Sequence, residues 1–394
     1  MNRRQFTKTS LLGIAASATA VRAETGKSLR VGVIGHTGRG NFGHGLDTVW
    51  LKLEETQIVA VADAVPAGLE KAGKHLKVKT GFLDYREMLS QTKPDIVAVC
   101  PRHIDQRRDM ILACVEAGVR GIYCEKPFVQ TPAQADEIIA AAQTRGTKIA
   151  VAHRNRYHPV LPVVKKFLRN GGLGKVLEIR GRGKGDRRGG AEDIWVLGTH
   201  VLNLMMYFGG APESCSAQLW QDGRLVTAKD VIPGAEGLGP LAGNELHARY
   251  GFANGIVGYF DSVHDDGTKN AGFGFQIIGS EGTLNFQCDK DPLVHLQRGN
   301  PFQPTANPAP WIPVTSAGVG QPETYNVRGQ VQNHVDAARD LIAALAAPGR
   351  QPLCNAREAA LAVEMVCASF ESHRQQGRAV ALPLKFRGNA LAEL

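Results

Sequence analysis

Residues 29–43 read LRVGVIGHTGRGNFG, and this stretch decides the fold that we expect. Its first seven residues are a short apolar run ending in Gly, which is typical of a buried strand in a parallel sheet. The glycines that follow leave the backbone bare, so that a phosphate group can approach it closely. We expect a helix to begin near Asn41, because a helix N-terminus offers free N–H groups and partial positive charge to a pyrophosphate.

Two registers are open for this glycine pattern. Gly38, Gly40 and Gly43 fit G-x-G-x-x-G literally, but that motif starts three residues after the strand. Gly35, Gly38 and Gly40 form the other register, with Gly35 at the strand end. Both registers predict a dinucleotide site. The residues of this loop that we expect to contact the cofactor are Gly35, Thr37, Gly38, Arg39 and Gly40.

Asp63 is the second part of the expected cofactor site, because it ends the next apolar run, TQIVAVAD. A carboxylate at this place holds both ribose hydroxyls and repels a 2′-phosphate, so the sequence favours NAD over NADP. Asp63 follows Gly35 by 28 residues, and the insertion GHGLDTVWLKLEE accounts for a spacing longer than usual. The alternative is a plain turn residue at a strand end.

Strands and helices alternate over residues 29–155. The apolar runs DIVAVCP, GIYCEKP and KIAVAHR alternate with three helical stretches, GFLDYREMLSQTKP, QRRDMILACVEAG and TPAQADEIIAAAQTRG. This order predicts an α/β Rossmann domain with a doubly wound parallel sheet. Ligands bind at the carboxyl ends of such strands, where Pro101, His103 and Glu125 are further expected cofactor contacts.

A different pattern begins near residue 156. Five short runs, LEIRGRG, ELHARYGF, GIVGYFDSV, GFGFQIIG and GTLNFQ, are separated by Gly and Asp turns and predict an open sheet. Two helical stretches near the end, VQNHVDAARDLIAALAAPG and AREAALAVEMVCASFESHRQQG, carry apolar stripes. We therefore expect a second α/β domain over residues 156–385.

The composition excludes several classes of protein. Of the 394 residues, 43% are hydrophobic and 21% are charged, which is ordinary for a globular protein with a core. The net charge of +9 is not gathered in a basic run with interleaved aromatic residues, so we expect no nucleic-acid partner. The seven cysteines show no C-x-x-C pair and the histidines are scattered, so we expect buried thiols and no metal.

The N-terminus, MNRRQFTKTSLLGIAASATAVRA, predicts export. Arg3 and Arg4 are followed by Phe6 and Lys8, then by a weakly apolar stretch and small residues that suit cleavage. We interpret residues 1–23 as a twin-arginine signal peptide and expect a periplasmic protein. The alternative is a basic N-terminus without meaning. The apolar part is too short for a membrane anchor, which needs about 20 residues.

Glu125-Lys126-Pro127 follows the apolar run GIYC directly and is the first candidate for chemistry. An ammonium group at a strand end beside a nicotinamide can bind the reacting hydroxyl or polarise a carbonyl oxygen, and Glu125 can fix its direction. Thr131 then caps a helix whose first residue is Pro132.

These features together resemble the Gfo/Idh/MocA family, named after glucose–fructose oxidoreductase, inositol dehydrogenase and rhizopine catabolism. E-K-P at 125–127 after a glycine-rich first loop is the most specific part of the resemblance. CPRH at 100–103, HRNRY at 153–157 and GSEGTL at 279–284 support it. The resemblance covers nearly all of the chain after residue 23.

The resemblance implies a Rossmann domain followed by an α/β domain with a large open, mostly antiparallel sheet. The nicotinamide of the cofactor would lie between these domains. It further implies a sugar, polyol or derivative as substrate, a homo-oligomer, and Lys126 as a catalytic residue. The family's Pro after this Lys is often cis, which extends the implication to Pro127.

The family's second catalytic segment reads D-x-G-x-H on a helix, and here the matching residues are Val196 to His200. His200 matches the family's His and can pass a proton as hydride leaves the same carbon; a packed core histidine is the alternative. The family's Asp is replaced by Val196. Asp193, two helical turns before His200, can supply a carboxylate on the same face, or be an N-cap without a chemical role.

Arg154, Arg156 and Tyr157 are the candidates for substrate contacts, with surface charge near a hinge as the alternative. The overall hypothesis is a periplasmic NAD(P)-dependent oxidoreductase acting on a sugar or sugar derivative, with a tightly bound cofactor that is recycled. One alternative is a redox-neutral glycosidase of the same fold that oxidises, eliminates, adds water and reduces again. The other is an exported sugar- or nucleotide-binding protein without catalysis, which the replacement at Val196 favours.

Overall fold

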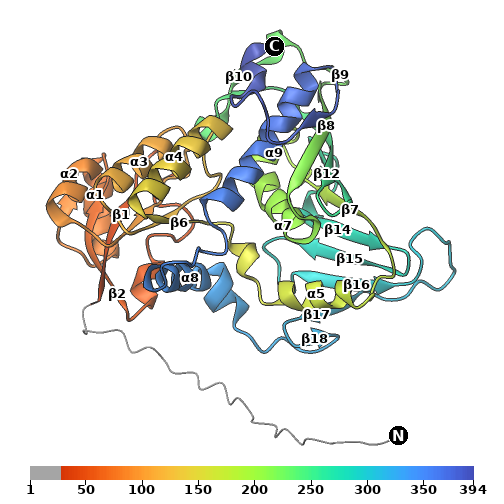
Figure 1. The fold of residues 1–394 in the computed structure, drawn as a ribbon, viewed down its shortest axis with the longest axis horizontal. Coiled ribbons are helices and arrows are strands. Elements are labelled where there is room, and N and C mark those ends of the chain that lie inside the picture. The colour runs from red at the N-terminus through yellow and green to blue at the C-terminus, as the bar shows by residue number, and fades with distance from the viewer. Residues whose placement is uncertain (1–27) are drawn as a thin grey trace, which may run out of the picture.

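The first half of the chain forms a six-stranded parallel sheet in the order β3-β2-β1-β4-β5-β6 (Figure 1). The computed structural model describes residues 28–394, so the expected export segment, residues 1–23, lies outside the described residues. The strands are β1 (Leu29–Ile34), β2 (Thr56–Ala62), β3 (Gly81–Phe82), β4 (Ile96–Val99), β5 (Gly121–Cys124) and β6 (Lys148–Val151). This sheet confirms the predicted Rossmann domain.

Helices cover both faces of this sheet. They are α1 (Pro66–His75), α2 (Tyr85–Thr92), α3 (Arg107–Glu116) and α4 (Pro132–Arg145). The predicted start of α4 is confirmed, because the Thr131 side chain accepts a hydrogen bond from the Gln134 N–H and Pro132 is the first helical residue. A core of buried apolar side chains joins α2, α3 and α4 to one face of the sheet.

The expectation of a helix near Asn41 is wrong. Between residues 36 and 48 the described chain makes turns and one isolated bridge between His36 and Asn41, and a short 3₁₀ helix, η1 (Val49–Lys52), follows. Gly40, Gly43 and Gly45 have φ angles of 85°, 68° and 96°, which a right-handed helix does not allow. A second core of buried apolar side chains covers the face of the parallel sheet opposite to α2, α3 and α4. It joins Trp50 of η1 to α1 and to the late helix α8 (Val335–Ala346).

The second half of the chain is built on an eleven-stranded sheet in the order β18-β17-β16-β15-β14-β7-β13-β12-β8-β19, with β9 paired to β8. Only β7 and β13 pair in parallel, and the other neighbours are antiparallel. The longer strands are β7 (Val176–Arg182), β8 (Pro212–Gln221), β12 (Glu245–Phe252), β13 (Val257–Val263), β14 (Gly274–Gly279), β15 (Gly282–Gln287) and β16 (Val294–Arg298). The shorter ones are β9 (Arg224–Leu225), β17 (Ile312–Thr315), β18 (Gly318–Val319) and β19 (Val380–Ala381). This confirms the predicted large, mostly antiparallel sheet.

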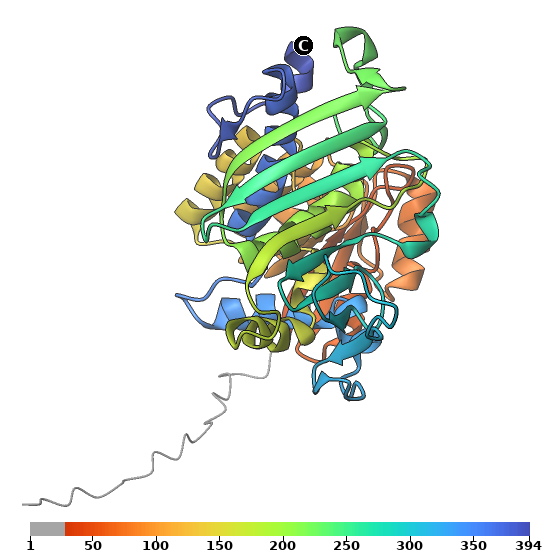
Figure 2. The same ribbon diagram turned by 90° about the vertical axis from the view of Figure 1, so that its right-hand side faces the viewer.

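One face of the large sheet is open, as Figure 2 shows, and helices lie behind the other face. These helices are α5 (Val160–Arg169), α7 (Thr199–Gly209) and α9 (Ala356–Arg374). Helix α9 also packs against α4, so the chain returns to the first sheet near its end. None of the helices in residues 28–394 has the length and apolar character that crossing a membrane requires.

Candidate active site

A cavity of about 90 Å³ lies where the carboxyl ends of β5 and β6 meet α7 of the second half. Lys126 follows β5, whereas His200 belongs to α7, so the two expected catalytic residues line the same cavity. The polar side chains that line it are His44, Glu125, Lys126, Arg154, His200, Asp289 and His334. The fold therefore brings together charged and titratable groups from six separate segments of the chain.

Lys126 is held in this cavity by a backbone group. Its Nζ donates a hydrogen bond of 2.7 Å to the carbonyl oxygen of Val196, and only 9% of the residue is exposed. Burial lowers the pKa of the Lys126 ammonium, while the charges of Glu125 and Asp289 act in the opposite direction. The peptide bond between Lys126 and Pro127 is cis, as the family resemblance implies.

His200 lies beside a second buried histidine. The ring centroids of His200 and His153 are 5.2 Å apart and nearly perpendicular. Burial lowers the pKa of His200 well below its ordinary value, and the charge of Lys126 adds to this effect. His200 is therefore a neutral imidazole near pH 7. Its Nδ1 is buried without a hydrogen-bond partner among the described residues, as are both ring nitrogens of His153.

Glu125 connects this cavity to the glycine-rich loop. Its Oε1 accepts hydrogen bonds from the backbone N–H of His44 at 3.0 Å and pairs with His44 Nδ1 at 2.6 Å. Its Oε2 accepts from the N–H of Lys126 at 2.9 Å. Burial disfavours the carboxylate, but the hydrogen bond and charge of His44, with the charges of Lys126 and Arg107, outweigh burial and lower the pKa of Glu125 to about 2.

Asp193 does not line the cavity. Its Oδ2 accepts hydrogen bonds from Ser262 Oγ at 2.7 Å and from the N–H of Lys184 at 3.0 Å. Burial raises the pKa of Asp193, against the hydrogen bonds from Ser262 and Lys184. The segment between Asp193 and α7, residues 194–198, is π-helical. The expected shared face with His200 is lost because one extra residue in a helical turn rotates what precedes it by about 100°.

The glycine-rich loop is shaped by Asp63. The Asp63 carboxylate is 1% exposed and accepts hydrogen bonds from Thr37 N, from Thr37 Oγ1 at 2.7 Å and from Val65 N at 2.9 Å. Gly35 stands at the strand end, and a Cβ there would collide with the ring of Phe42. The ribose contact expected of Asp63 stays a prediction, since its carboxylate here organises the loop.

Arg39, Pro101 and His103 meet next to this loop. Arg39 forms an ion pair with Asp105, and the N–H of His103 lies 3.4 Å from the Arg39 carbonyl oxygen. The carbonyl of Pro101 accepts a hydrogen bond from the buried Arg107 side chain. Burial lowers the pKa of His103, and the charge of Arg39 adds to this. The expected cofactor contacts therefore gather at the carboxyl ends of β1 and β4.

Only one of the three expected substrate contacts reaches the cavity. Arg154 lines it and pairs with Asp289, their Nη2 and Oδ1 atoms lying 3.0 Å apart. Arg156 is buried and instead donates to the Asn203 carbonyl at 3.0 Å and to Glu358 at 3.1 Å. Tyr157 donates to Asp340 at 3.2 Å, away from the cavity. Arg156 and Tyr157 thus join segments of the fold.

Asp289, His44 and His334 were not predicted from the sequence. Asp289 follows β15, and His334 immediately precedes α8, each far from Lys126 along the chain. The sequence offers one indication for Asp289, because the stretch D-K-D-P at 289–292 is typical of a turn. Both Asp289 and His334 have positive φ, 60° and 63°.

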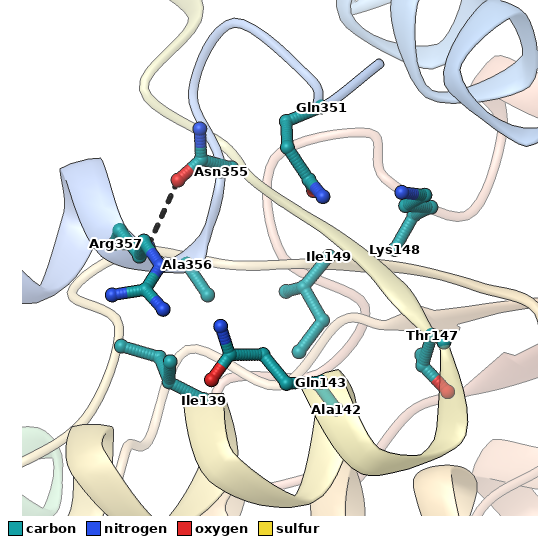
Figure 3. A pocket seen from close by; sticks show the side chains of 11 residues that line it. Ile139, Ala142, Gln143, Thr147, Lys148, Ile149, Gln351, Asn355, Ala356 and Arg357 are labelled. Atoms are coloured by element: carbon teal, nitrogen blue, oxygen red, sulfur yellow. Dashed lines mark hydrogen bonds between the residues drawn. The ribbon is translucent and has the colours of Figure 1, made fainter. Parts of the chain in front are cut away.

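A second hollow, of about 340 Å³, lies between α4 and the N-terminus of α9 (Figure 3). Ile139 and Gln143 of α4 line one side, and Asn355 and Arg357 line the other. The Asn355 side chain accepts a hydrogen bond from the N–H of Arg357, which caps α9. None of the side chains expected in the active site lines this hollow, so it does not bear on the chemistry.

Comparisons with known proteins agree with this architecture. Residues 29–153 match a family model described as "Oxidoreductase family, NAD-binding Rossmann fold". Levoglucosan dehydrogenase of Pseudarthrobacter phenanthrenivorans is 24% identical to this chain over a match that covers 58% of this chain and 65% of that enzyme's length. D-apiose dehydrogenase of Paraburkholderia graminis is 25% identical over 84% of this chain and 85% of its own length. The solved structure of levoglucosan dehydrogenase in complex with NADH and levoglucosan superimposes with a TM-score of 0.69, at 21% identity, over 91% of this chain and 100% of that one.

Residues 29–153 therefore match an oxidoreductase family with an NAD-binding Rossmann fold, and these residues form the six-stranded parallel sheet. The matching model is that of the Gfo/Idh/MocA family, and the superposition over 91% of this chain shows the same fold for the remainder.

The residues around the glycine-rich loop fit NAD. Arg39 Nε and His103 Nδ1 are buried there without a partner among the described residues. Gly38 has a φ of 82°, and nothing in the described chain lies within 4 Å of a Cβ placed on it. A bare backbone beside the cationic Arg39 and the N–H donors of this loop suits a pyrophosphate.

Proposed function

We propose that this protein oxidises a hydroxyl group of a sugar or related polyol with NAD. The observation that carries the proposal is the shared cavity of Lys126 and His200 at the carboxyl edge of the Rossmann sheet. The named dehydrogenases to which the chain is similar support a carbohydrate substrate. When bound, NAD accepts the hydride from the carbon that is oxidised.

In this proposal Lys126 binds the oxygen of the reacting hydroxyl. One proton of its ammonium is used by the Val196 carbonyl, and this contact fixes the direction of the group. The remaining N–H bonds can donate to the substrate oxygen and stabilise the negative charge that develops on it. Because Lys126 is buried, this electrostatic stabilisation is stronger than it would be in solution.

His200 is the group that takes the proton of that hydroxyl. Its imidazole is neutral near pH 7 because it is buried beside Lys126, so it has an unshared electron pair available. The neighbouring His153 is neutral as well, since burial lowers its pKa to about 3. A proton accepted by His200 lies near the positive charges of Lys126, Arg154 and His44.

The direct test uses a panel of hexoses, pentoses, anhydro sugars and polyols with the NAD-loaded protein. We expect at least one member to produce NADH absorbance in the wild type, and Lys126→Met and His200→Asn to reduce the rate by about 10²- to 10⁴-fold. Lys165→Met on α5 is the control, because this lysine is exposed and contacts only the Tyr207 carbonyl and ring. Equal rates in the wild type and the Lys126 variant would refute the assignment.

We further propose that the protein is periplasmic and keeps its cofactor through many turnovers. A segment that we call the strap, residues 232–241 between β9 and β12, supports retention. Its Glu236 carbonyl accepts from the N–H of Ile104 at 3.0 Å, and its Gly237 carbonyl accepts from Gln130 Nε2 at 2.7 Å. The strap thus attaches the second half of the chain to the same edge of the Rossmann sheet that carries the expected cofactor contacts.

Cofactor retention is tested by the rate at which bound NADH exchanges with free NAD. We expect exchange to be slower than turnover in the wild type and faster in Gln130→Ala, which loses the contact with Gly237. Ile232→Ser is the control, because this side chain is 62% exposed on the same strap. Protein that purifies without cofactor and binds NAD only at micromolar or higher concentration would contradict retention.

Product analysis separates oxidation from redox-neutral hydrolysis. If the wild type releases the aglycone of a glycoside without a lasting change in NADH absorbance, the chemistry is that of the glycosidase. If no sugar of the panel changes the absorbance of the bound cofactor, the result favours the binding protein over the oxidoreductase. The main proposal expects a lasting absorbance change with a neutral sugar.

A further inference from the structure

Asp289 is a carboxylate of the active-site cavity that has no role in the proposed function. It follows β15 of the second half and lines the cavity together with Lys126, Arg154 and His200. Its side chain is 30% exposed, so a molecule that enters from solvent can reach it. The other carboxylate of the cavity, Glu125, is 1% exposed.

The contacts of Asp289 use only one of its two oxygens. Oδ1 accepts from Arg154 Nε at 3.1 Å and from Asn155 Nδ2 at 3.1 Å, and it lies 3.0 Å from Arg154 Nη2. Among residues 28–394, no donor is hydrogen-bonded to Oδ2. Glu125 differs, because both of its oxygens accept hydrogen bonds from His44 or Lys126.

The backbone also holds Asp289 in place. Its φ of 60° is in the left-handed region, which an aspartate adopts at some cost in free energy. The N–H of Asp289 lies 3.4 Å from Asn155 Oδ1, so Asn155 contacts both the backbone and the side chain of this residue. Arg154 is anchored in turn, since its Nη1 donates to the Gln332 carbonyl at 3.2 Å. These contacts fix the orientation of the carboxylate before any ligand arrives.

The free oxygen accepts a hydrogen bond most strongly from a hydroxyl or amine donor. The charges of Lys126 and Arg154 balance those of Glu125 and Asp289, so the cavity suits a neutral ligand better than an ion. A second hydroxyl of a neutral substrate meets both conditions. A hydroxyl at Lys126 and His200 and another at Asp289 would also hold the substrate in one orientation.

We propose that Asp289 is a substrate-binding residue whose Oδ2 accepts a hydrogen bond from a hydroxyl other than the one that is oxidised. This inference rests on the proposed function and adds a requirement to it, namely that the substrate carries at least two hydroxyl groups. A simple secondary alcohol lacks the second donor and is therefore a poor substrate.

The first test is Asp289→Asn in the full chain with NAD bound, which preserves the shape of the side chain and its Oδ1 contacts. The substrate is whichever member of the sugar panel gives the largest NADH absorbance in the wild type. We expect kcat/KM to fall by about 10- to 100-fold, the usual loss for a hydrogen bond to a charged group. We expect most of this loss in KM. Asp291→Asn is the matched control, because this residue stands in the same turn and its side chain is exposed.

A second measurement keeps the inference testable if the variant folds poorly or no sugar is oxidised. Monodeoxy analogues of the chosen sugar are compared in the wild type and in Asp289→Asn. The analogue that lacks the hydroxyl bound by Asp289 is a poor substrate for the wild type, and the variant shows no further loss with it. Where no sugar is oxidised, titration calorimetry of the NADH-loaded protein with the sugar panel replaces kinetics.

The outcomes are distinct. A wild type that oxidises no sugar contradicts the proposed function. In that case, weaker sugar binding by Asp289→Asn than by the wild type supports the inference about Asp289, and equal binding overturns it. An active wild type with an unchanged Asp289→Asn variant overturns the inference and leaves the proposed function intact. A wild type that neither oxidises nor binds any sugar of the panel overturns the inference together with the proposed function.

Discussion

Lowering the pH from 7 to 5.5 will destabilise this protein strongly, because burial strongly lowers the pKa of four of its histidines. Burial lowers the pKa of His153 to about 3 and of His158 and His334 to about 4, and it lowers the pKa of His200 well below its ordinary value. In the unfolded chain all four titrate near 6.5. At pH 5.5 these histidines therefore bind protons in the unfolded state and remain unprotonated in the folded state.

The magnitude follows from proton linkage. Each histidine with a depressed folded pKa contributes stability that is present above pH 6.5 and is lost as the pH falls below it. Between pH 7 and 5.5 the loss is about 1.3 kcal/mol for one histidine and about 5 kcal/mol for four. A domain is typically stable by only about 5–15 kcal/mol, so this change takes a large part of the total.

The assay is urea denaturation at a series of pH values between 5 and 8. The slope of the unfolding free energy against pH gives the number of protons taken up on unfolding, and we expect about three to four near pH 5.5. His247 acts in the opposite direction above pH 6.5, because its contacts with Asp261 and Glu245 raise its folded pKa to about 9 and only the folded state is charged there; near pH 5.5 it is charged in both states and leaves the slope unchanged. A slope near zero between pH 6.5 and 5.5 would refute the claim that these imidazoles are buried and neutral.

Three further predictions follow from other parts of the structure. Gly43→Ala is expected to lower the unfolding free energy by about 2–4 kcal/mol, because its φ is positive and a Cβ would lie 2.6 Å from the Cys100 carbonyl oxygen and 2.8 Å from Glu125 Oε1. Gly118→Ala is the matched control, with a φ of 78° and open space, and is expected to cost only about 1 kcal/mol; equal losses in urea denaturation would contradict the packing argument. Asp193→Asn is expected to change kcat by less than about 10-fold while lowering the unfolding free energy. The reason is that its carboxylate accepts hydrogen bonds from Ser262 and from the N–H of Lys184 and does not line the cavity. A larger loss of kcat at unchanged melting temperature would restore the catalytic role for Asp193. Arg3→Lys with Arg4→Lys is expected to retain the protein in the cytoplasm, as measured by cell fractionation, and normal export of this variant would contradict the twin-arginine interpretation.

Most of the fold could be predicted because local patterns carry it. The apolar runs that end in Gly35, Asp63 and Lys126 each became a parallel strand, and the cap at Thr131 was visible in the sequence. Lys126 could be placed because a motif at a strand end points to the edge of the sheet where ligands bind. The same reasoning from the strand end failed at Asn41, where three successive glycines with positive φ replace the expected helix with turns.

The rest of the site could not be predicted, because it depends on distant contacts and on one change of helical register. A sequence pattern assumes 3.6 residues per turn, so the π-helical segment 194–198 was invisible and Asp193 was placed on the wrong face. Asp289 and His334 reach the cavity only through the pairing of the large sheet and the return of α8. No short motif records such tertiary proximity.

The central claim is that the ammonium of Lys126 and the imidazole of His200 act together on one substrate hydroxyl. The most direct measurement is the rate of a single turnover, followed as NADH absorbance after mixing sugar with NAD-loaded wild type, Lys126→Met, His200→Asn and the double variant. The account predicts that each single change slows the reaction at least about 100-fold and that the double variant is hardly slower than the worse single one. Either single variant reducing its bound NAD at the wild-type rate would contradict the account.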